Sequence, residues 1–151
     1  MSHIAKIKVE IKDLDALKSI AKKLGLEFVE GQKSYRWYGR SMGDAPLPEG
    51  FTKDDLGKCD HALRIPQSVQ DYRQPYEIGV VKRKDGKSGY ELLWDYWNGG
   101  YGLTDKIGQK GEKLIQGYAV EVATRSAIKQ GFRVCGTVTR KDGKVELTVM
   151  K

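Results

Sequence analysis

The sequence predicts an α+β fold, with a mainly antiparallel sheet of about six strands and two helices packed on one of its faces. Stretches with apolar residues at helical spacing alternate with stretches of period-two alternation, and two Asp-Gly pairs between apolar runs are typical of β-hairpins. The chain has 151 residues, of which 39% are hydrophobic and 31% are charged. This length and composition suit one folded domain, residues 1–151, with a modest core.

The N-terminal part predicts a strand followed by a helix. Apolar and charged residues alternate over residues 6–12, which is typical of a strand with one buried face. Asp13 then stands at an N-cap position, and apolar residues follow at helical spacing until Gly25, so this pattern predicts a helix over about residues 14–24. Residues 26–38 contain several aromatic residues around a glycine and predict one or two further strands.

The middle of the chain changes character at residues 39–58, where six glycine and proline residues interrupt any regular element. We expect a flexible loop or an insertion there, which is either mobile or part of a binding feature. After it, residues 62–65 predict a short strand that ends at Pro66. Residues 76–82 and 89–97 predict a strand pair, because an Asp-Gly turn lies between them.

The C-terminal part predicts a second helix and a second hairpin. Apolar residues at helical spacing run over about residues 112–130, and Gly131 ends the pattern. Residues 132–138 and 145–149 alternate on either side of the turn sequence Lys-Asp-Gly, which indicates a hairpin. The predicted chain therefore closes on two strands that follow a helix directly.

The two predicted hairpins share the turn sequence Arg-Lys-Asp-Gly-Lys, at residues 83–87 and 140–144. A helix, a glycine and a strand also follow one another in the same order at residues 14–29 and 112–135. This echo has two interpretations. It marks a pseudo-duplication of a helix-plus-hairpin unit, or it reflects only that Asp-Gly turns flanked by lysine are common at solvated hairpin tips, which we favour.

Three regions of the chain resemble a known family. They are Met1-Ser2-His3 with Ile7, Ile11-Lys12-Asp13-Leu14 and Ala16-Leu17, then Tyr76-Glu77-Ile78-Gly79-Val80 with Tyr90-Glu91-Leu92, and finally Gln116, Tyr118-Ala119 and Gln130-Gly131-Phe132. In these residues the chain is similar to the hypothetical chloroplast open reading frame thirty-five family, a domain of unknown function found in plastids, cyanobacteria, other bacteria and phages. The resemblance implies no assigned reaction, cofactor or catalytic residue. Residues 39–57 and the pair Val120-Glu121 depart from the family's pattern, which indicates a divergent or viral member.

Few residues of this chain are candidates for catalytic or metal chemistry. The histidines are His3 and His61, and only Cys59 places a nucleophile near one of them in the sequence. On a regular strand Cys59 and His61 would share a face, where a metal ion could bridge them with His3 or Cys135 completing the site. We favour the alternative that Cys59 packs as a small hydrophobic residue and His61 lies at a sheet edge, because the chain has no Cys-x-x-Cys pair. We therefore expect free thiols, no bound metal and no cofactor.

Two further motifs are ambiguous. The glycine-rich residues 99–102 lack the complete phosphate-binding patterns, so we expect a flexible strand-to-helix turn there rather than a nucleotide site. The aromatic residues within 35–38 and 94–97 alternate with charged ones. Such residues either fill the core or anchor a nucleic acid or protein partner, and we expect about half of them in the core.

The net charge of +7, from 27 Lys and Arg against 20 Asp and Glu, favours anionic partners. Turn residues are normally solvated, so the basic hairpin tips are the candidate binding residues for nucleic acid or a protein partner. With one basic residue from an earlier strand, they are Arg36, Lys82, Arg83, Lys84, Lys87, Arg140, Lys141 and Lys144. They form one positive patch only if the two tips lie on the same edge of the sheet.

These observations rank three candidate functions. We expect first a non-enzymatic binding or adaptor protein with a protein partner, second a basic nucleic-acid-binding module, and third a thiol or metal enzyme that uses Cys59 and His61. No apolar run approaches the roughly 20 residues that a membrane span needs. We therefore expect no membrane contact and a cytoplasmic protein, or a stromal one if it is plastid-encoded.

Overall fold

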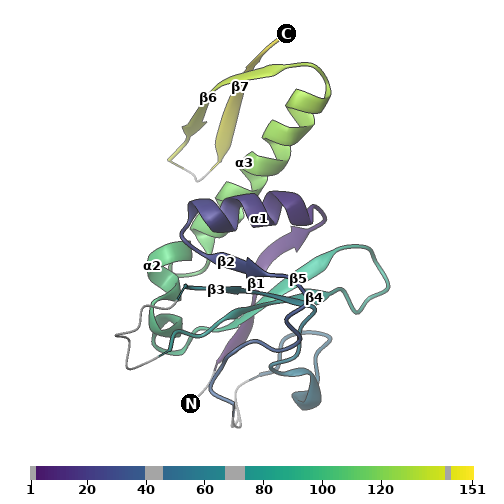
Figure 1. The fold of residues 1–151 in the computed structure, drawn as a ribbon, viewed down its shortest axis with the longest axis vertical. Helices are drawn as coiled ribbons and strands as arrows, with labels where there is room; N and C mark the ends of the chain where they lie inside the picture. The colour runs from purple at the N-terminus through teal and green to yellow at the C-terminus, as the bar shows by residue number, and fades with distance from the viewer. Residues whose placement is uncertain (1–2, 40–45, 67–73, 142–143) are drawn as a thin grey trace.

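The computed structural model (Figure 1) describes residues 3–39, 46–66, 74–141 and 144–151. A five-stranded antiparallel sheet has the strand order β1-β5-β4-β3-β2, and β6 and β7 form a separate two-stranded sheet. The strands are β1 (Ile4–Ile11), β2 (Glu27–Val29), β3 (His61–Arg64), β4 (Ile78–Lys82), β5 (Tyr90–Asp95), β6 (Arg133–Thr139) and β7 (Val145–Met150). The helices are α1 (Leu14–Lys23), α2 (Leu103–Ile107) and α3 (Glu112–Lys129), with 3-10 turns at Lys53–Asp55 and Trp97–Tyr101.

The α+β class is confirmed, but the strands divide differently from the prediction. The described residues contain seven strands in two sheets and three helices, instead of about six strands and two helices. The last hairpin stands apart because α3 runs away from the sheet and places β6 and β7 beyond it (Figure 1). In the two echoed segments, β2 joins the main sheet through β3, whereas β6 pairs only with β7 among the described residues, so the strands of the echo have different pairings.

Side chains cover the five-stranded sheet on both faces. Consecutive residues of a strand point to opposite faces, so Leu92 and Leu93 in β5 enter two different clusters. The helix-side cluster joins the sheet to all three helices and consists of Ile7, Ile11, Ala16, Leu17, Ile20, Ala21, Leu26, Leu63, Tyr76, Ile78, Val80, Leu92, Trp94, Leu103, Ile107, Leu114 and Tyr118. The loop-side cluster consists of Ile4, Tyr35, Phe51, Cys59, Ala62, Val81 and Leu93.

The first helix begins as its sequence predicts. The side chain of Asp13 accepts a hydrogen bond from the backbone N–H of Ala16 at 3.0 Å, which confirms the N-cap. Its buried stripe, Ala16, Leu17, Ile20 and Ala21, faces the sheet. Helix α1 therefore closes one half of the helix-side cluster, and α3 crosses beside it to close the other.

The last thirty residues, 122–151, extend from this core as a C-terminal arm. The arm contains the second half of α3 and the β6–β7 hairpin, which Figure 1 shows beyond α1 and away from the sheet. The buried residues of α3 are Leu114, Tyr118 and Glu121, all before the arm, and no described residue of β6 or β7 is buried. The predicted turn at Asp142-Gly143 and residues 40–45 of the predicted loop lie outside the described residues.

Candidate functional site

Cys59 lies in the interior rather than in an open site. Its side chain is 8% exposed, and its Sγ donates a hydrogen bond to the backbone carbonyl of Gln32 at 3.1 Å. Burial raises the pKa of this thiol to about 12. Because the thiolate is the form that attacks substrates and binds metals, burial disfavours both roles for Cys59 at neutral pH.

His61 is held among aromatic rings. Its ring centroid lies 5.3 Å from that of Phe28 and 5.7 Å from that of Tyr90, and its Nδ1 accepts a hydrogen bond from the backbone N–H of Gly31 at 3.0 Å. Phe28 and Tyr90 pack against the helix-side cluster, whereas Cys59 belongs to the loop-side cluster. Cys59 and His61 therefore do not share a face, because the regular strand begins only at His61.

The other two candidates for a thiol or metal site lie elsewhere. His3 stacks on Tyr96 with a centroid distance of 5.4 Å, at the start of β1. Cys135 is an exposed free thiol in the C-terminal arm. Among the described residues, no group of three or more His, Cys, Asp or Glu side chains is placed to hold a metal ion.

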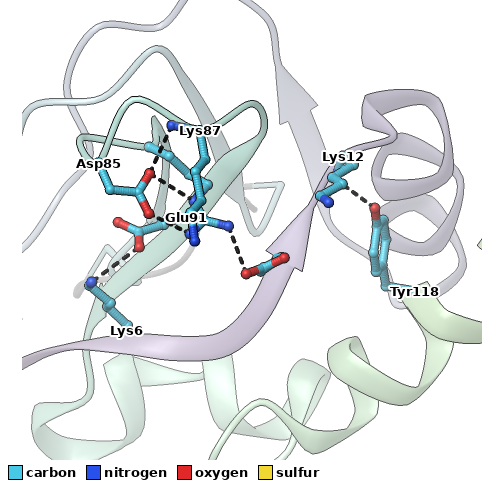
Figure 2. A network of polar contacts seen from close by, with 8 residues as sticks. Lys6, Lys12, Asp85, Lys87, Glu91 and Tyr118 are labelled. Atoms are coloured by element: carbon cyan, nitrogen blue, oxygen red, sulfur yellow. Dashed lines mark hydrogen bonds and ion pairs between the residues drawn. The ribbon is translucent and has the colours of Figure 1, made fainter.

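Two of the basic residues at the β4–β5 connection, Arg83 and Lys84, are engaged in ion pairs, and Figure 2 shows Asp85 of this connection within the network of polar contacts. The Arg83 guanidinium lies 2.7 Å from Glu10 and 2.6 Å from Asp85, and only 10% of its side chain is exposed. Lys84 pairs with Asp55 at 3.0 Å. The structure therefore makes Arg83 a bridge between the hairpin and β1 rather than a solvated turn residue.

The remaining basic candidates near the sheet lie in two places. Arg36 donates from Nη1 to the carbonyl of Pro75 at 3.0 Å, and its backbone N–H donates to the buried Glu77 at 2.8 Å. Lys82 and Lys87 are exposed at the two ends of the β4–β5 turn. Arg36 therefore stabilises a loop contact.

The second basic hairpin lies apart from the first. Figure 1 shows the β4–β5 connection at one end of the main sheet and the β6–β7 hairpin beyond the helices. Arg140 pairs with Glu146 across the hairpin, and Lys141 and Lys144 continue the group toward β7. The eight predicted basic residues are thus distributed over separate surfaces.

The C-terminal arm carries most of the excess positive charge. Residues 122–151 contain seven Lys and Arg against two Asp and Glu, which is +5 of the chain's net +7. Within the part of the chain that the structure describes, Lys129, Arg133 and Lys141 form no ion pair. The arm also exposes aliphatic side chains, with Val138 58% and Met150 53% exposed. Positive charge and exposed apolar surface therefore coincide.

An open groove of about 460 Å³ lies between α3 and β7. Its walls are mainly apolar and are formed by Ile115, Ala119, Val120 and Ala123 of α3 with Val145 and Leu147 of β7. Ala119 and Ala123 are exposed and lie one helical turn apart, so their small side chains leave the α3–β7 groove open. The local sequence did not predict this groove, and its only local signal was a pair of alanines at i and i+4 on an apolar stripe.

The predicted aromatic stretches form a second exposed surface, at the N-terminal end of β1. Tyr38, Tyr96 and Trp97 are 41–46% exposed, and the rings of Tyr96 and Trp97 contact His3. The other aromatic residues of the two stretches pack in or against the buried clusters. Beneath the exposed rings the buried Asp95 accepts hydrogen bonds from the backbone N–H groups of His3, Tyr38 and Trp97 at 3.0–3.2 Å. This carboxylate therefore holds together three backbone segments that are far apart in the sequence or separated by a turn.

Comparison with known proteins gives the family. A family model described as a protein of unknown function (DUF1257) matches residues 51–148. The chain belongs to this family. The DUF1257 match includes the whole of α3, both walls of the α3–β7 groove and all of β6, so the arm is part of the family's common sequence up to residue 148. No curated protein and no solved structure matches the chain.

Within residues 3–39, 46–66, 74–141 and 144–151 of the DUF1257 chain, no helix is long and apolar enough to cross a membrane.

Proposed function

We propose that this DUF1257 protein is a non-enzymatic binding or adaptor protein that contacts a protein partner through its C-terminal arm. The observation that carries the proposal is the coincidence, on one projecting element, of a net charge of +5 with exposed aliphatic side chains. Val138 lies opposite Glu146 and Met150 lies opposite Arg133, so the exposed apolar residues are spread along the hairpin among charged ones. Protein interfaces commonly combine apolar and polar contacts in this way. A partner that covers Val138 and Met150 would remove this apolar surface from water.

The stability of the arm supports the same proposal. A two-stranded hairpin is at best marginally stable in water, and in the part of the chain that the structure describes this hairpin packs mainly against one helix, α3. A partner that adds contacts to the hairpin would stabilise it by mass action. The arm therefore has an exposed surface that a partner could cover, and binding of that partner would stabilise the hairpin.

The contacts of the candidate catalytic residues give no support to a thiol or metal enzyme. Cys59 is buried with a raised pKa, and His61 is packed between rings on the other face of the sheet. The buried carboxylates Asp95 and Glu77 accept backbone hydrogen bonds, and Glu121 pairs with Lys23. Each of these groups has a structural partner.

A basic nucleic-acid-binding module is the second candidate, and the unpaired Lys129, Arg133 and Lys141 favour it. Phosphate contacts of this kind give affinity without sequence preference. The exposed aliphatic side chains beside these residues favour a protein instead, because single strands are held by aromatic side chains that stack on bases.

The finer family assignment is also a proposal. The resemblance to the hypothetical chloroplast open reading frame thirty-five family, with a divergent 39–57 segment, supports a plastid-type reading frame whose product acts in the cytoplasm or stroma.

Affinity capture from the cells that make the protein tests the proposed function. The arm variant carries Val138→Glu and Met150→Glu, and a matched control carries Ser88→Glu and Gln109→Glu, which change the charge equally at exposed sites outside the arm. We expect a captured protein that resists nuclease treatment and is lost with the arm variant but not with the control. Capture that disappears on nuclease treatment would favour nucleic acid, and equal capture by both variants would contradict a role for the arm.

A further inference from the structure

We infer that the α3–β7 groove binds an extended acidic segment of the partner protein as a third strand of the C-terminal hairpin. This inference rests on the proposed function and specifies the chemistry of the partner. Three features of the groove support it: the open edge of a strand, mainly apolar walls and the net positive charge of the arm around it.

The open edge is the outer side of β7. In the described residues β7 pairs only with β6. The N–H of Arg140 donates to the carbonyl of Lys144 at 2.7 Å, so these two residues form a hydrogen-bonded pair of the ladder. Hydrogen-bonded and non-hydrogen-bonded pairs alternate in an antiparallel ladder, so the backbone groups of Val145 and Leu147 point away from β6.

The same two residues line the groove. Val145 and Leu147 form its β7 wall, and no residue of β6 lines it, so the groove lies beside β7. A strand entering here would hydrogen-bond to the edge of β7 and turn alternate side chains toward α3. Ala119 and Ala123 leave room on the helix for those side chains.

Charge decides which kind of segment fits. The arm carries a net +5, so an acidic segment is attracted to it and a basic one is repelled. A second copy of this chain would bring another arm of +5 against the first, which disfavours an exchange of hairpins between copies. The occupant therefore comes from a different, acidic protein.

The composition of the arm favours a peptide over a nucleic acid. Phe132 is the only aromatic residue in residues 122–151, and Lys151 lies over its ring at 5.8 Å. Base stacking needs free aromatic faces, whereas the groove offers aliphatic walls that match aliphatic side chains.

Binding of synthetic peptides to the full chain tests this inference. The probe is a fluorescein-labelled ten-residue peptide that alternates Val with Glu, and its affinity is measured by fluorescence anisotropy. Comparison peptides replace Glu with Lys, or carry N-methyl groups on all Val residues or on all Glu residues. We expect the affinity of the Lys peptide to be at least about tenfold lower, because it lacks the negative charge. We expect the same loss for one of the two N-methylated peptides, because it cannot form the strand hydrogen bonds.

Two variants locate the site. Ala119→Glu places bulk and negative charge in the groove, and Ser126→Glu makes the same charge change at an exposed residue of α3 outside its lining. We expect about a tenfold loss of affinity for Ala119→Glu and less than about threefold for Ser126→Glu. Amide hydrogen exchange should slow at residues 145–149 of wild type when the Val/Glu peptide is present.

Several outcomes would overturn the inference. They are failure of the Val/Glu peptide to bind, equal loss with both variants, binding that neither N-methylation pattern weakens, and preferential binding of a mixed-sequence single-stranded oligonucleotide. If the peptide fails while a nuclease-resistant partner is still lost with Val138→Glu and Met150→Glu, the proposed function stands and only the groove is wrong. If no such partner is captured, the proposed function itself fails.

Discussion

The side-chain hydroxyl of Tyr118 accepts a hydrogen bond from the backbone N–H of Lys12 at 2.9 Å (Figure 2), and a second from the backbone N–H of Asp13 at 3.1 Å. Tyr118 lies on α3, whereas Lys12 and Asp13 connect β1 to α1. One buried ring thus fixes α3 at the point where the first helix begins. Because the arm continues from α3, this contact also sets the direction in which the arm leaves the core.

Replacing Tyr118 with Phe should lower the free energy of unfolding by about 1 kcal/mol, because two backbone donors lose their acceptor while the ring keeps its packing. Urea denaturation measures this difference. Tyr96→Phe is the matched control, because Tyr96 is 46% exposed, and it should change stability by less than about 0.5 kcal/mol. Equal stability of the two variants would show that water replaces the Tyr118 hydroxyl without cost.

Gly79 in β4 should not tolerate a side chain. A Cβ at this position would lie 2.3 Å from Cδ1 of Tyr35, whose ring is buried in the loop-side cluster. We expect Gly79→Ala to destabilise the protein by about 1–3 kcal/mol through overpacking. Gly136→Ala in β6 is the control, because a Cβ there would meet no described atom within 4 Å apart from those of its chain neighbours, and thermal denaturation should show little change. A stable Gly79→Ala variant would mean that Tyr35 moves freely.

Local patterns were enough to predict the elements that depend on local physics. Period-two alternation gave β1, and the Asp13 cap with its apolar stripe gave α1. Residues 26–38 form only the short β2 and a single bridge between Ser34 and Lys58, because strand length depends on a pairing partner that the local sequence does not name.

The candidate site was harder to predict from the sequence, because it depends on contacts between residues that are far apart in the chain. Arg83 lies in a charged turn, and its partner Glu10 is on another strand, so the turn alone gives no sign that its side chain is mostly covered. Reversing the charge of Arg83 would therefore break contacts with Glu10 and Asp85, and Arg83 is unsuitable for a test of nucleic-acid binding. The α3–β7 groove arises from the spacing between a helix and a hairpin, which no periodicity encodes.

The buried thiol of Cys59 should make stability depend on alkaline pH. Its pKa rises from the ordinary value of 9.0 to about 12 on folding, mainly through burial. The folded state therefore binds this proton more tightly, so the contribution is complete below about pH 9 and is lost as the pH rises toward 12. Urea denaturation of wild type between pH 8 and 11 should show falling stability, with a shallower fall in Cys59→Ala. Identical slopes would show that this thiol does not contribute.

The backbone amides of the C-terminal arm should exchange with solvent faster than those of the main sheet. Strands β4 and β5 are central and carry buried side chains on both faces, whereas β6 and β7 have open edges and no buried residue among those described. Local opening is easiest where few apolar contacts must break. Hydrogen exchange followed by mass spectrometry should therefore show low protection at residues 133–139 and 145–150, high protection at 78–82 and 90–95, and intermediate protection in the second half of α3. If the hairpin were protected as strongly as β4 in the isolated chain, the arm would not need a partner to be ordered, and the argument from its marginal stability would fall.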